Sequence, residues 1–175
     1  SDVYKRQERR HIFGEDDEVE NKKVLAALRH NFTPLLCVGE TDGQKAFGIE
    51  NEVLRAQLKI GLWGTAPEQA GNIWIAYEPV WAIGVGGIPA DVSYANEKHT
   101  VIRETLEEIY GKETGAKIPI LYGGSVNNIN AHELVQTPNI DGLFIGRSAW
   151  DAKNFSMIIH DLMNMQPYLL ATKKK

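Results

Sequence analysis

A carboxylate followed by a glycine-rich segment is the feature of this sequence with the clearest chemical potential. Glu78 comes directly after an apolar run and precedes Pro79, Val80 and Trp81, with glycines recurring as far as Gly87. Rigid residues at one end of a loop form a hinge, and glycines let the tip approach a ligand closely. A loop that covers a carboxylate excludes water and raises its basicity. Glu78 is therefore a candidate general base, with a strand-end ion pair as the alternative.

Two further turns are rich in hydrogen-bond donors. Gly123-Gly124-Ser125 follows one apolar run, and Gly146-Arg147-Ser148 follows the next run along the chain. Adjacent glycines expose backbone N–H groups, which can bind an anion. Alone, the first turn also fits a tight connection in which Ser125 caps a helix. Because a second such turn follows, we favour a phosphate site like that after the last two strands of a (β/α)8 barrel.

The elements that must position these residues alternate between strands and helices. Four nearly continuous apolar runs predict parallel strands buried on both faces: Pro34–Val38, Ile73–Tyr77, Ile118–Tyr122 and Ile140–Ile145. Helical periodicity lies around them, in Asp17–His30, Glu50–Ile60, Ala95–Tyr110 and Asn154–Met165, with a shorter helix near Asn128–Val135. This alternation predicts an α/β fold with right-handed crossovers and a parallel sheet. The polar clusters at the strand ends would then share one edge of the sheet.

Composition limits the classes of partner. The 175 residues can form one domain with a substantial core, and the net charge of −4 argues against general nucleic-acid or membrane binding. Cys37 is the only cysteine, which excludes an intrachain disulfide and a cysteine-based metal site. No apolar run approaches the roughly 18 residues that span a bilayer, and we find no secretory signal. We expect a cytoplasmic protein.

The first residues stand apart from this pattern. The chain opens without Met, and Asp2 to Gln7 matches the in-frame translation of a common sequencing-library adapter. We therefore exclude residues 1–7 from the fold as a non-native segment and expect the gene to continue upstream. A genuine polar N-terminal segment is the alternative.

Together the motifs resemble the triosephosphate isomerase family. The segment Ala76–Gly84 is similar to the family's signature around its catalytic Glu and flexible loop. Glu8–Glu15 resembles the segment after the family's fourth strand, and Leu36–Thr41 resembles its fifth strand. Tyr122–Asn127 and Asp141–Gly146 resemble the seventh and eighth strands. The order and spacing hold from about residue 8 to residue 168. The resemblance implies a (β/α)8 TIM barrel, truncated to roughly strands 5–8, with residues 8–175 as part of one domain.

The resemblance also implies a site. Glu78 would be the base that moves a proton between the carbons flanking a carbonyl, through an enediol(ate). The phosphate would be held by N–H groups of Gly84, Ser125, Gly146 and Arg147. Glu8 and Cys37 would lie behind the reacting groups, although a small buried thiol is the alternative for Cys37. The loop that prevents phosphate elimination would comprise Pro79, Val80, Trp81, Ile83, Val85, Gly86 and Gly87. Neither a metal nor an organic cofactor is implied, since this proton transfer needs neither.

Three positions depart from the family pattern. Val85 stands where the family usually has Thr, Gly87 where it has Lys, and Arg147 where it has Gly. These changes resemble a subgroup thought to isomerise tetrulose phosphates such as erythrulose phosphate. The main hypothesis is interconversion of glyceraldehyde 3-phosphate and dihydroxyacetone phosphate in glycolysis and gluconeogenesis. The alternatives are a tetrulose-phosphate isomerase and a non-catalytic phosphate-binding relative.

The electrophilic residues of the family are missing. Its His and Ser would occupy the positions of Arg6 and Gln7, and its Lys and Asn would lie upstream. Because stabilising the enediolate oxygen is usually a large contribution to catalysis, we expect this chain alone to be inactive. By the same resemblance, the full-length protein would be a homodimer. Arg103 is expected to be structural rather than catalytic.

Overall fold

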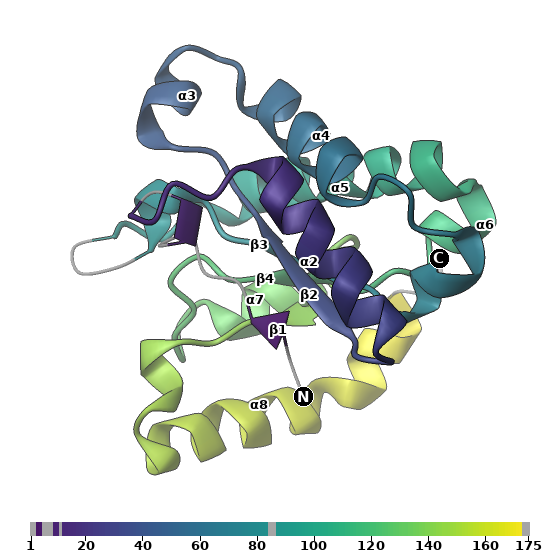
Figure 1. The fold of residues 1–175 in the computed structure, drawn as a ribbon. Coiled ribbons are helices and arrows are strands. Elements are labelled where there is room, and N and C mark those ends of the chain that lie inside the picture. The colour runs from purple at the N-terminus through teal and green to yellow at the C-terminus, as the bar shows by residue number, and fades with distance from the viewer. Residues whose placement is uncertain (1–2, 5–8, 11, 84–86, 173–175) are drawn as a thin grey trace.

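Five parallel strands form a single sheet in the computed structural model, which describes residues 3–4, 9–10, 12–83 and 87–172 (Figure 1). Along the sheet the strands follow their order in the chain: β1 Val3–Tyr4, β2 Pro34–Val38, β3 Trp74–Tyr77, β4 Ile120–Tyr122 and β5 Gly142–Leu143. Every neighbouring pair is parallel. A sheet in which each strand is added beside the previous one through helical crossovers is the pattern of consecutive units of a (β/α)8 barrel.

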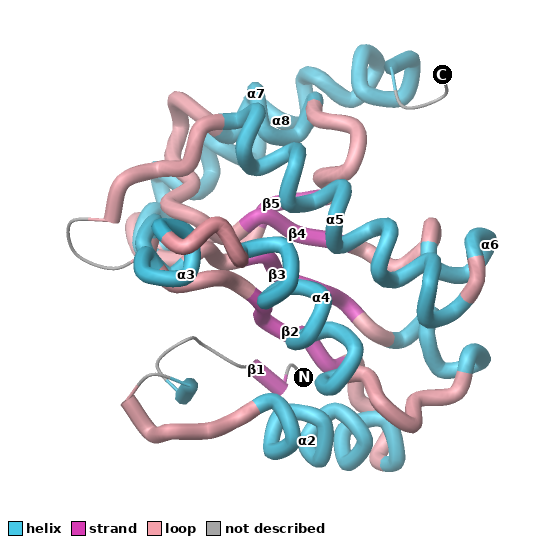
Figure 2. The backbone as a smooth tube through the Cα atoms, turned by 90° about the horizontal axis from the view of Figure 1, so that it is seen from above, coloured by secondary structure: helices cyan, strands magenta, loops and turns pink. Residues whose placement is uncertain are grey.

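Helices connect the strands. The longer helices are α2 Asp17–Arg29, α4 Glu50–Gly61, α5 Val92–Tyr110 and α8 Ala152–Thr172, and the shorter ones are α3 Asp42–Ala46, α6 Lys112–Gly115 and α7 Ala131–Gln136. The described residues also form short 3-10 helices, η1 Pro67–Asn72, η2 Val80–Ala82 and η3 Arg147–Ala149. Seen from above in Figure 2, α2, α4 and α5 follow one another along the same side of the sheet. None of the described helices is long and apolar enough to cross a membrane.

Both faces of the sheet are covered with apolar side chains. Leu36 and Val38 of β2 point into the main core, which they share with helix residues such as Leu54 and Ile102. The alternate residues Leu35 and Cys37 belong to a smaller cluster on the opposite face, together with Ala76 of β3 and, at its margin, Leu121 and Phe144. Burial on both faces explains why the strands read as continuous apolar runs rather than as alternating ones.

The register aligns the ends of the strands. Val38 lies beside Tyr77, Tyr77 beside Tyr122, and Tyr122 beside Leu143. The residues that follow each strand, beginning with Gly39, Glu78 and Gly123, therefore lie at one edge of the sheet. This is the edge at which parallel α/β proteins carry their chemistry.

The predicted elements are confirmed, with shifts at their ends. β2 has the predicted bounds, whereas β5 is confined to Gly142–Leu143 instead of Ile140–Ile145. Helix α5 begins at Val92 rather than Ala95, because the Asp91 side chain accepts a hydrogen bond from the Ser93 N–H and caps the first turn. The helix predicted at Asn128–Val135 begins at Ala131.

Two of the residues set aside as 1–7 nevertheless pair with the sheet. Val3 and Tyr4 form β1 and pair in parallel with Pro34 and Leu35 of β2. Strand pairing uses backbone groups, so a short segment of almost any sequence can add to an exposed sheet edge. The non-native origin of the segment remains a prediction.

Candidate functional site

Glu78 leaves the carboxyl end of β3 with its backbone fixed on both sides. Its N–H donates to the Val38 carbonyl of β2 at 2.8 Å, and the Gly123 N–H donates to the Tyr77 carbonyl at 2.8 Å. These bonds extend the sheet ladder by one residue beyond β3 and β4. The Glu78 side chain is 8% exposed. A carboxylate held this way stands on a rigid element, as the role of a positioned base requires.

Gly123 and Cys37 both lie against the Glu78 side chain. A Cβ atom added to Gly123 would lie 2.7 Å from Cγ of Glu78 and 3.2 Å from Cδ1 of Phe144, so the carboxylate arm lies directly over this glycine. Burial, followed by the charge and hydrogen bonding of Glu78, raises the pKa of the Cys37 thiol well above its ordinary value. Cys37 is thus a neutral thiol beside the carboxylate.

The two donor-rich turns lie next to each other. The Ser148 hydroxyl of η3 donates to the Val126 carbonyl at 2.7 Å, which joins the turn after β5 to the turn after β4. Ser125 adopts a left-handed backbone conformation with φ of 52°. Its hydroxyl donates to the Ala82 carbonyl at the end of η2. The phosphate site expected at these turns stays a prediction, and the Ser125 hydroxyl is engaged with the loop that follows Glu78.

The remaining predicted site residues differ in how deeply they are buried. Gly146 and Arg147 are exposed at the start of η3. In the loop after Glu78, Pro79 is buried and Val80, Trp81 and Ile83 are half-buried. Glu8, Gly84, Val85 and Gly86 lie outside the described residues, so their predicted roles stay predictions.

Gly87 is at a position where only glycine fits. An added Cβ would lie 2.7 Å from the carbonyl oxygens of Ala82 and Ile83. Backbone atoms at that distance cannot move aside as the end of a flexible side chain can, so any larger residue would push the two ends of the loop apart. In this structure, the Lys that the family usually has at this position would clash with the backbone.

Sequence reasoning missed a buried carboxylate one strand away. Glu40 follows β2 and is fully buried. It accepts hydrogen bonds from the Tyr77 hydroxyl at 3.1 Å, the Trp81 indole N–H at 2.8 Å and the Tyr94 hydroxyl at 2.9 Å. The strand-end position of Glu40 was visible in the sequence, but its donors come from up to 54 residues away, which no local pattern reveals.

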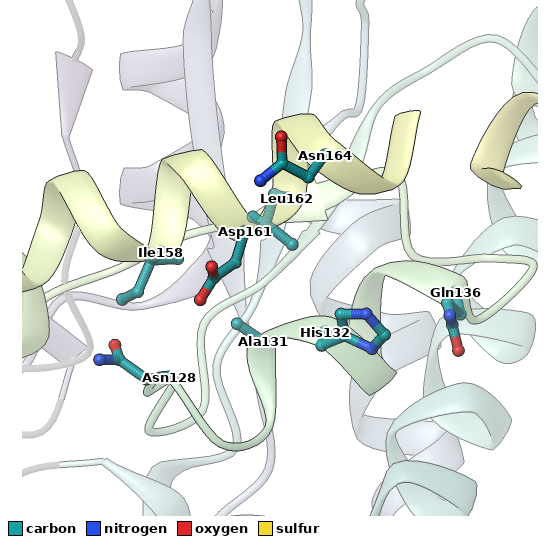
Figure 3. Close-up of a pocket in the computed structure, with 8 residues that line it drawn as sticks. All are labelled: Asn128, Ala131, His132, Gln136, Ile158, Asp161, Leu162 and Asn164. Carbon is teal, nitrogen blue, oxygen red and sulfur yellow. The ribbon is translucent and has the colours of Figure 1, made fainter. Parts of the chain in front are cut away.

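A pocket lies away from these residues. It has a volume of about 510 Å³, lies between parts of α7 and α8, and is lined by eight residues, among them His132 and Asp161, which Figure 3 labels. It contains none of the predicted site residues. Among the described residues, no group of three or more His, Cys, Asp or Glu side chains is arranged to hold a metal ion.

The sequence model of the triosephosphate isomerase family matches residues 6–162. The chain is 50% identical to the L-erythrulose-1-phosphate isomerase of Rhizobium etli over 154 residues, which cover 87% of this chain and 56% of that protein. It is also 50% identical to the triosephosphate isomerase of Roseiflexus castenholzii over 157 residues, covering 89% and 61% respectively.

A third relative, the triosephosphate isomerase of Chloroflexus aurantiacus, is 44% identical over 155 residues, with 87% of this chain and 61% of that protein covered. The chain thus spans about three fifths of the length of these curated relatives. The family match covers most of the chain, and the strand order, register and site geometry fit a barrel of this kind. The chain belongs to the triosephosphate isomerase family.

Proposed function

We propose that the full-length protein interconverts glyceraldehyde 3-phosphate and dihydroxyacetone phosphate, with Glu78 as the base. The observation that carries this proposal is the position of Glu78, which lies buried at the end of β3 over Gly123 and next to the neutral thiol of Cys37. The donor-rich turns after β4 and β5 begin at the same edge of the sheet. A base and an anion site side by side suit a small phosphorylated substrate.

The chemistry needs a single group that both removes and returns a proton. The Glu78 carboxylate would take a proton from the carbon beside the carbonyl, and the electron pair of that C–H bond would form the enediolate. Returning the proton to the neighbouring carbon completes the exchange of aldose and ketose. Backbone N–H groups of Ser125, Gly146 and Arg147, together with Gly84, would hold the phosphate while the proton moves.

A tetrulose phosphate is the second candidate substrate. The Rhizobium etli relative, whose name specifies L-erythrulose 1-phosphate, is as similar to this chain as the Roseiflexus castenholzii enzyme is. Gly87 and Arg147, the described departures from the usual pattern, stand at the loop and at the phosphate turn. Several triosephosphate isomerases are among the relatives, and these support the triose substrate as the main proposal. Neither the base nor the type of reaction differs between the candidates.

Two further expectations, on assembly and location, accompany this proposal. A homodimer and a cytoplasmic location would suit an enzyme of glycolysis and gluconeogenesis in this family. The names of the relatives specify only the reaction. The homodimer and the cytoplasmic location follow from the proposed reaction and not from those names.

The test is turnover of both substrates by the full-length gene product. We expect fast isomerisation of glyceraldehyde 3-phosphate and slow turnover of erythrulose 1-phosphate. Glu78→Gln should lower kcat by about 10²–10⁴-fold, because the amide cannot accept the proton, while inorganic phosphate still binds. Glu68→Gln, at an exposed position in η1, is the matched control and should leave kcat unchanged.

Three outcomes separate the hypotheses. Full activity of Glu78→Gln would show that the base is misassigned. Faster turnover of erythrulose 1-phosphate than of triose phosphate by the unmodified protein would establish the second candidate. Binding of phosphate without turnover of either sugar would indicate the non-catalytic relative.

A further inference from the structure

One buried carboxylate is hydrogen-bonded to both ends of the segment that follows Glu78. Trp81, near the start of that segment, donates its indole N–H to Oε1 of Glu40 at 2.8 Å. Tyr94, in the first turn of α5 at the far end, donates its hydroxyl to the same oxygen at 2.9 Å. Thirteen positions of sequence are therefore spanned by two hydrogen bonds that share one acceptor atom.

The two donors also touch each other. The rings of Trp81 and Tyr94 are 5.6 Å apart and meet edge to face at 72°. The Lys45 ammonium lies 3.5 Å from the Trp81 ring centre and 4.6 Å from that of Tyr94, so one cation contacts both rings. A cation over aromatic faces adds attraction that is strongest where water is excluded.

The Tyr94 ring is also held from its own helix. The Lys98 ammonium lies 4.8 Å from the ring centre. That lysine is 1% exposed and is fixed by Glu50 at 3.1 Å and Asn51 at 2.8 Å. Tyr94 thus has little freedom to leave Glu40 while the helix stays in place.

The hydroxyl of Tyr94 remains a donor over the whole physiological range. Burial, followed by the charge of Glu40, raises the pKa of Tyr94 well above its ordinary value. A hydrogen bond to a fully buried carboxylate is among the stronger ones in proteins, and its loss leaves part of a desolvated charge without a donor. Losing the Tyr94 hydroxyl therefore leaves Glu40, the residue that also fixes Trp81, less firmly held.

We propose that Tyr94 is a positioning residue for the isomerase reaction: by sharing Glu40 with Trp81, it fixes the separation of the two ends of the loop that follows Glu78. This inference rests on the proposed function and goes beyond it, since the contacts described for Tyr94 are with Glu40, Trp81, Lys45 and Lys98 rather than with the base. Fixing both ends limits the arrangements open to the loop beside the carboxylate. Reactions that need the loop in one arrangement should then depend on the Tyr94 hydroxyl.

A chemical readout separates positioning from simple stabilisation. An enediolate can lose its phosphate group when the C–O bond to phosphate breaks and its electron pair leaves with the oxygen. Loop residues that cover the intermediate suppress this loss relative to isomerisation. The ratio of inorganic phosphate released to isomer formed therefore reports the arrangement of the loop and is unaffected by how much protein is folded.

The experiment compares Tyr94→Phe in the full-length protein with Tyr110→Phe as the matched control. Both tyrosines belong to α5, and the Tyr110 hydroxyl is bonded to Thr65 far from Glu40. For Tyr94→Phe we expect kcat to fall about tenfold, KM to stay within about twofold, and the phosphate-to-isomer ratio to rise severalfold. For Tyr110→Phe all three quantities should stay at the unmodified values.

Unchanged kcat and an unchanged phosphate-to-isomer ratio in folded Tyr94→Phe would overturn the proposal. If that variant fails to fold in a melting experiment, Trp81→Phe removes the bond between Glu40 and the first end of the segment and must show the same rise in the ratio. A normal ratio there overturns the proposal as well. An unmodified protein that turns over neither sugar phosphate instead contradicts the proposed function. In that case the indole N–H resonance of Trp81 tests the shared bond: a shift in Tyr94→Phe supports it, and no shift overturns it.

Discussion

Gly123 and Glu78 are in closer contact than any larger residue at position 123 would allow. A Cβ atom on Gly123 would lie 2.7 Å from Cγ of Glu78 and 3.3 Å from its Oε1. Gly123 is buried and its N–H is bonded to Tyr77, so the backbone cannot retreat without breaking the sheet ladder. The glycine therefore sets the height at which the carboxylate stands above the end of β4.

Gly123→Ala should displace the Glu78 carboxylate and reduce activity far more than stability. A misplacement of about 1 Å can cost about 10²-fold in rate, and we expect a loss of kcat of about that size in the full-length protein. Gly43→Ala is the matched control, since a Cβ there meets nothing within 4 Å. Steady-state kinetics and thermal melting of both variants provide the measurement. Equal kcat values for the two variants would contradict the contact.

Cys37 should be almost unreactive in the folded protein. Burial, followed by Glu78, raises the pKa of its thiol well above the ordinary value, and only the thiolate is nucleophilic. At pH 8 we expect iodoacetamide to modify Cys37 at least about 10²-fold more slowly in the native protein than in urea, as followed by mass spectrometry of its peptide. Rapid native labelling would show that the thiol is open to solvent and would remove it from the neighbourhood of the base.

The sequence was sufficient to predict the four strands β2 to β5 and the edge where they end, because both depend on local patterns. The run Pro34–Val38 is apolar throughout since both sheet faces are covered, and its bounds were predicted without error. The contact of Glu78 with Cys37 was expected only through the family resemblance. Nothing in the spacing of these residues along the chain places the thiol beside the carboxylate.

What escaped prediction depends on long-range packing. The convergence of Tyr77, Trp81 and Tyr94 on Glu40 is set by the register of β2 with β3 and by the path of α5. The steric need for Gly87 was likewise invisible, because it arises from carbonyls of Ala82 and Ile83 folding back on it. The pairing of β1 was missed because backbone hydrogen bonding is indifferent to the side chains that had suggested exclusion.

Buried tyrosines should make the protein sensitive to alkali. Burial raises the pKa of Tyr122 from its ordinary value near 10 to about 12, and burial also raises that of Tyr77. Below pH 10 the tyrosines are protonated in both states, so their contribution is intact. As the pH rises above 10 the unfolded chain ionises first, and stability falls until the folded pKa is passed.

The measurement is urea unfolding of the full-length protein between pH 8 and pH 11. For Tyr122 alone, the expected loss approaches about 3 kcal/mol of unfolding free energy once the pH exceeds 12, and about half of that is lost by pH 11. Tyr122→Phe cannot ionise, so its stability should decline less steeply over the same range. Parallel pH profiles for the variant and the unmodified protein would contradict the role assigned to Tyr122.

Arg103 should prove structural, because all of its described contacts lie at the opposite end of β4 from Glu78. Its guanidinium donates to the carbonyls of Gly115 at 2.8 Å and Ile118 at 2.6 Å and to the carboxylate of Asp141 at 2.5 Å. Asp141 in turn accepts from the Ile120 N–H at 2.9 Å. One buried side chain thereby joins α5 to the connections that lead into β4 and β5.

Arg103→Leu should lower the unfolding free energy by about 2–4 kcal/mol, because it takes this donor from the Gly115 and Ile118 carbonyls and one of two donors from the partly exposed Asp141. The kcat of the folded fraction should change by less than about twofold, since nothing near Glu78 depends on this contact. Arg55→Leu is the matched control: Arg55 bonds Glu104 and Glu108 on the surface of α4 and α5, where such pairs contribute up to about 1 kcal/mol each. Denaturant unfolding and kinetics at a temperature where each variant is folded give both quantities. A large fall in kcat for Arg103→Leu with little loss of stability would instead give Arg103 a part in the reaction.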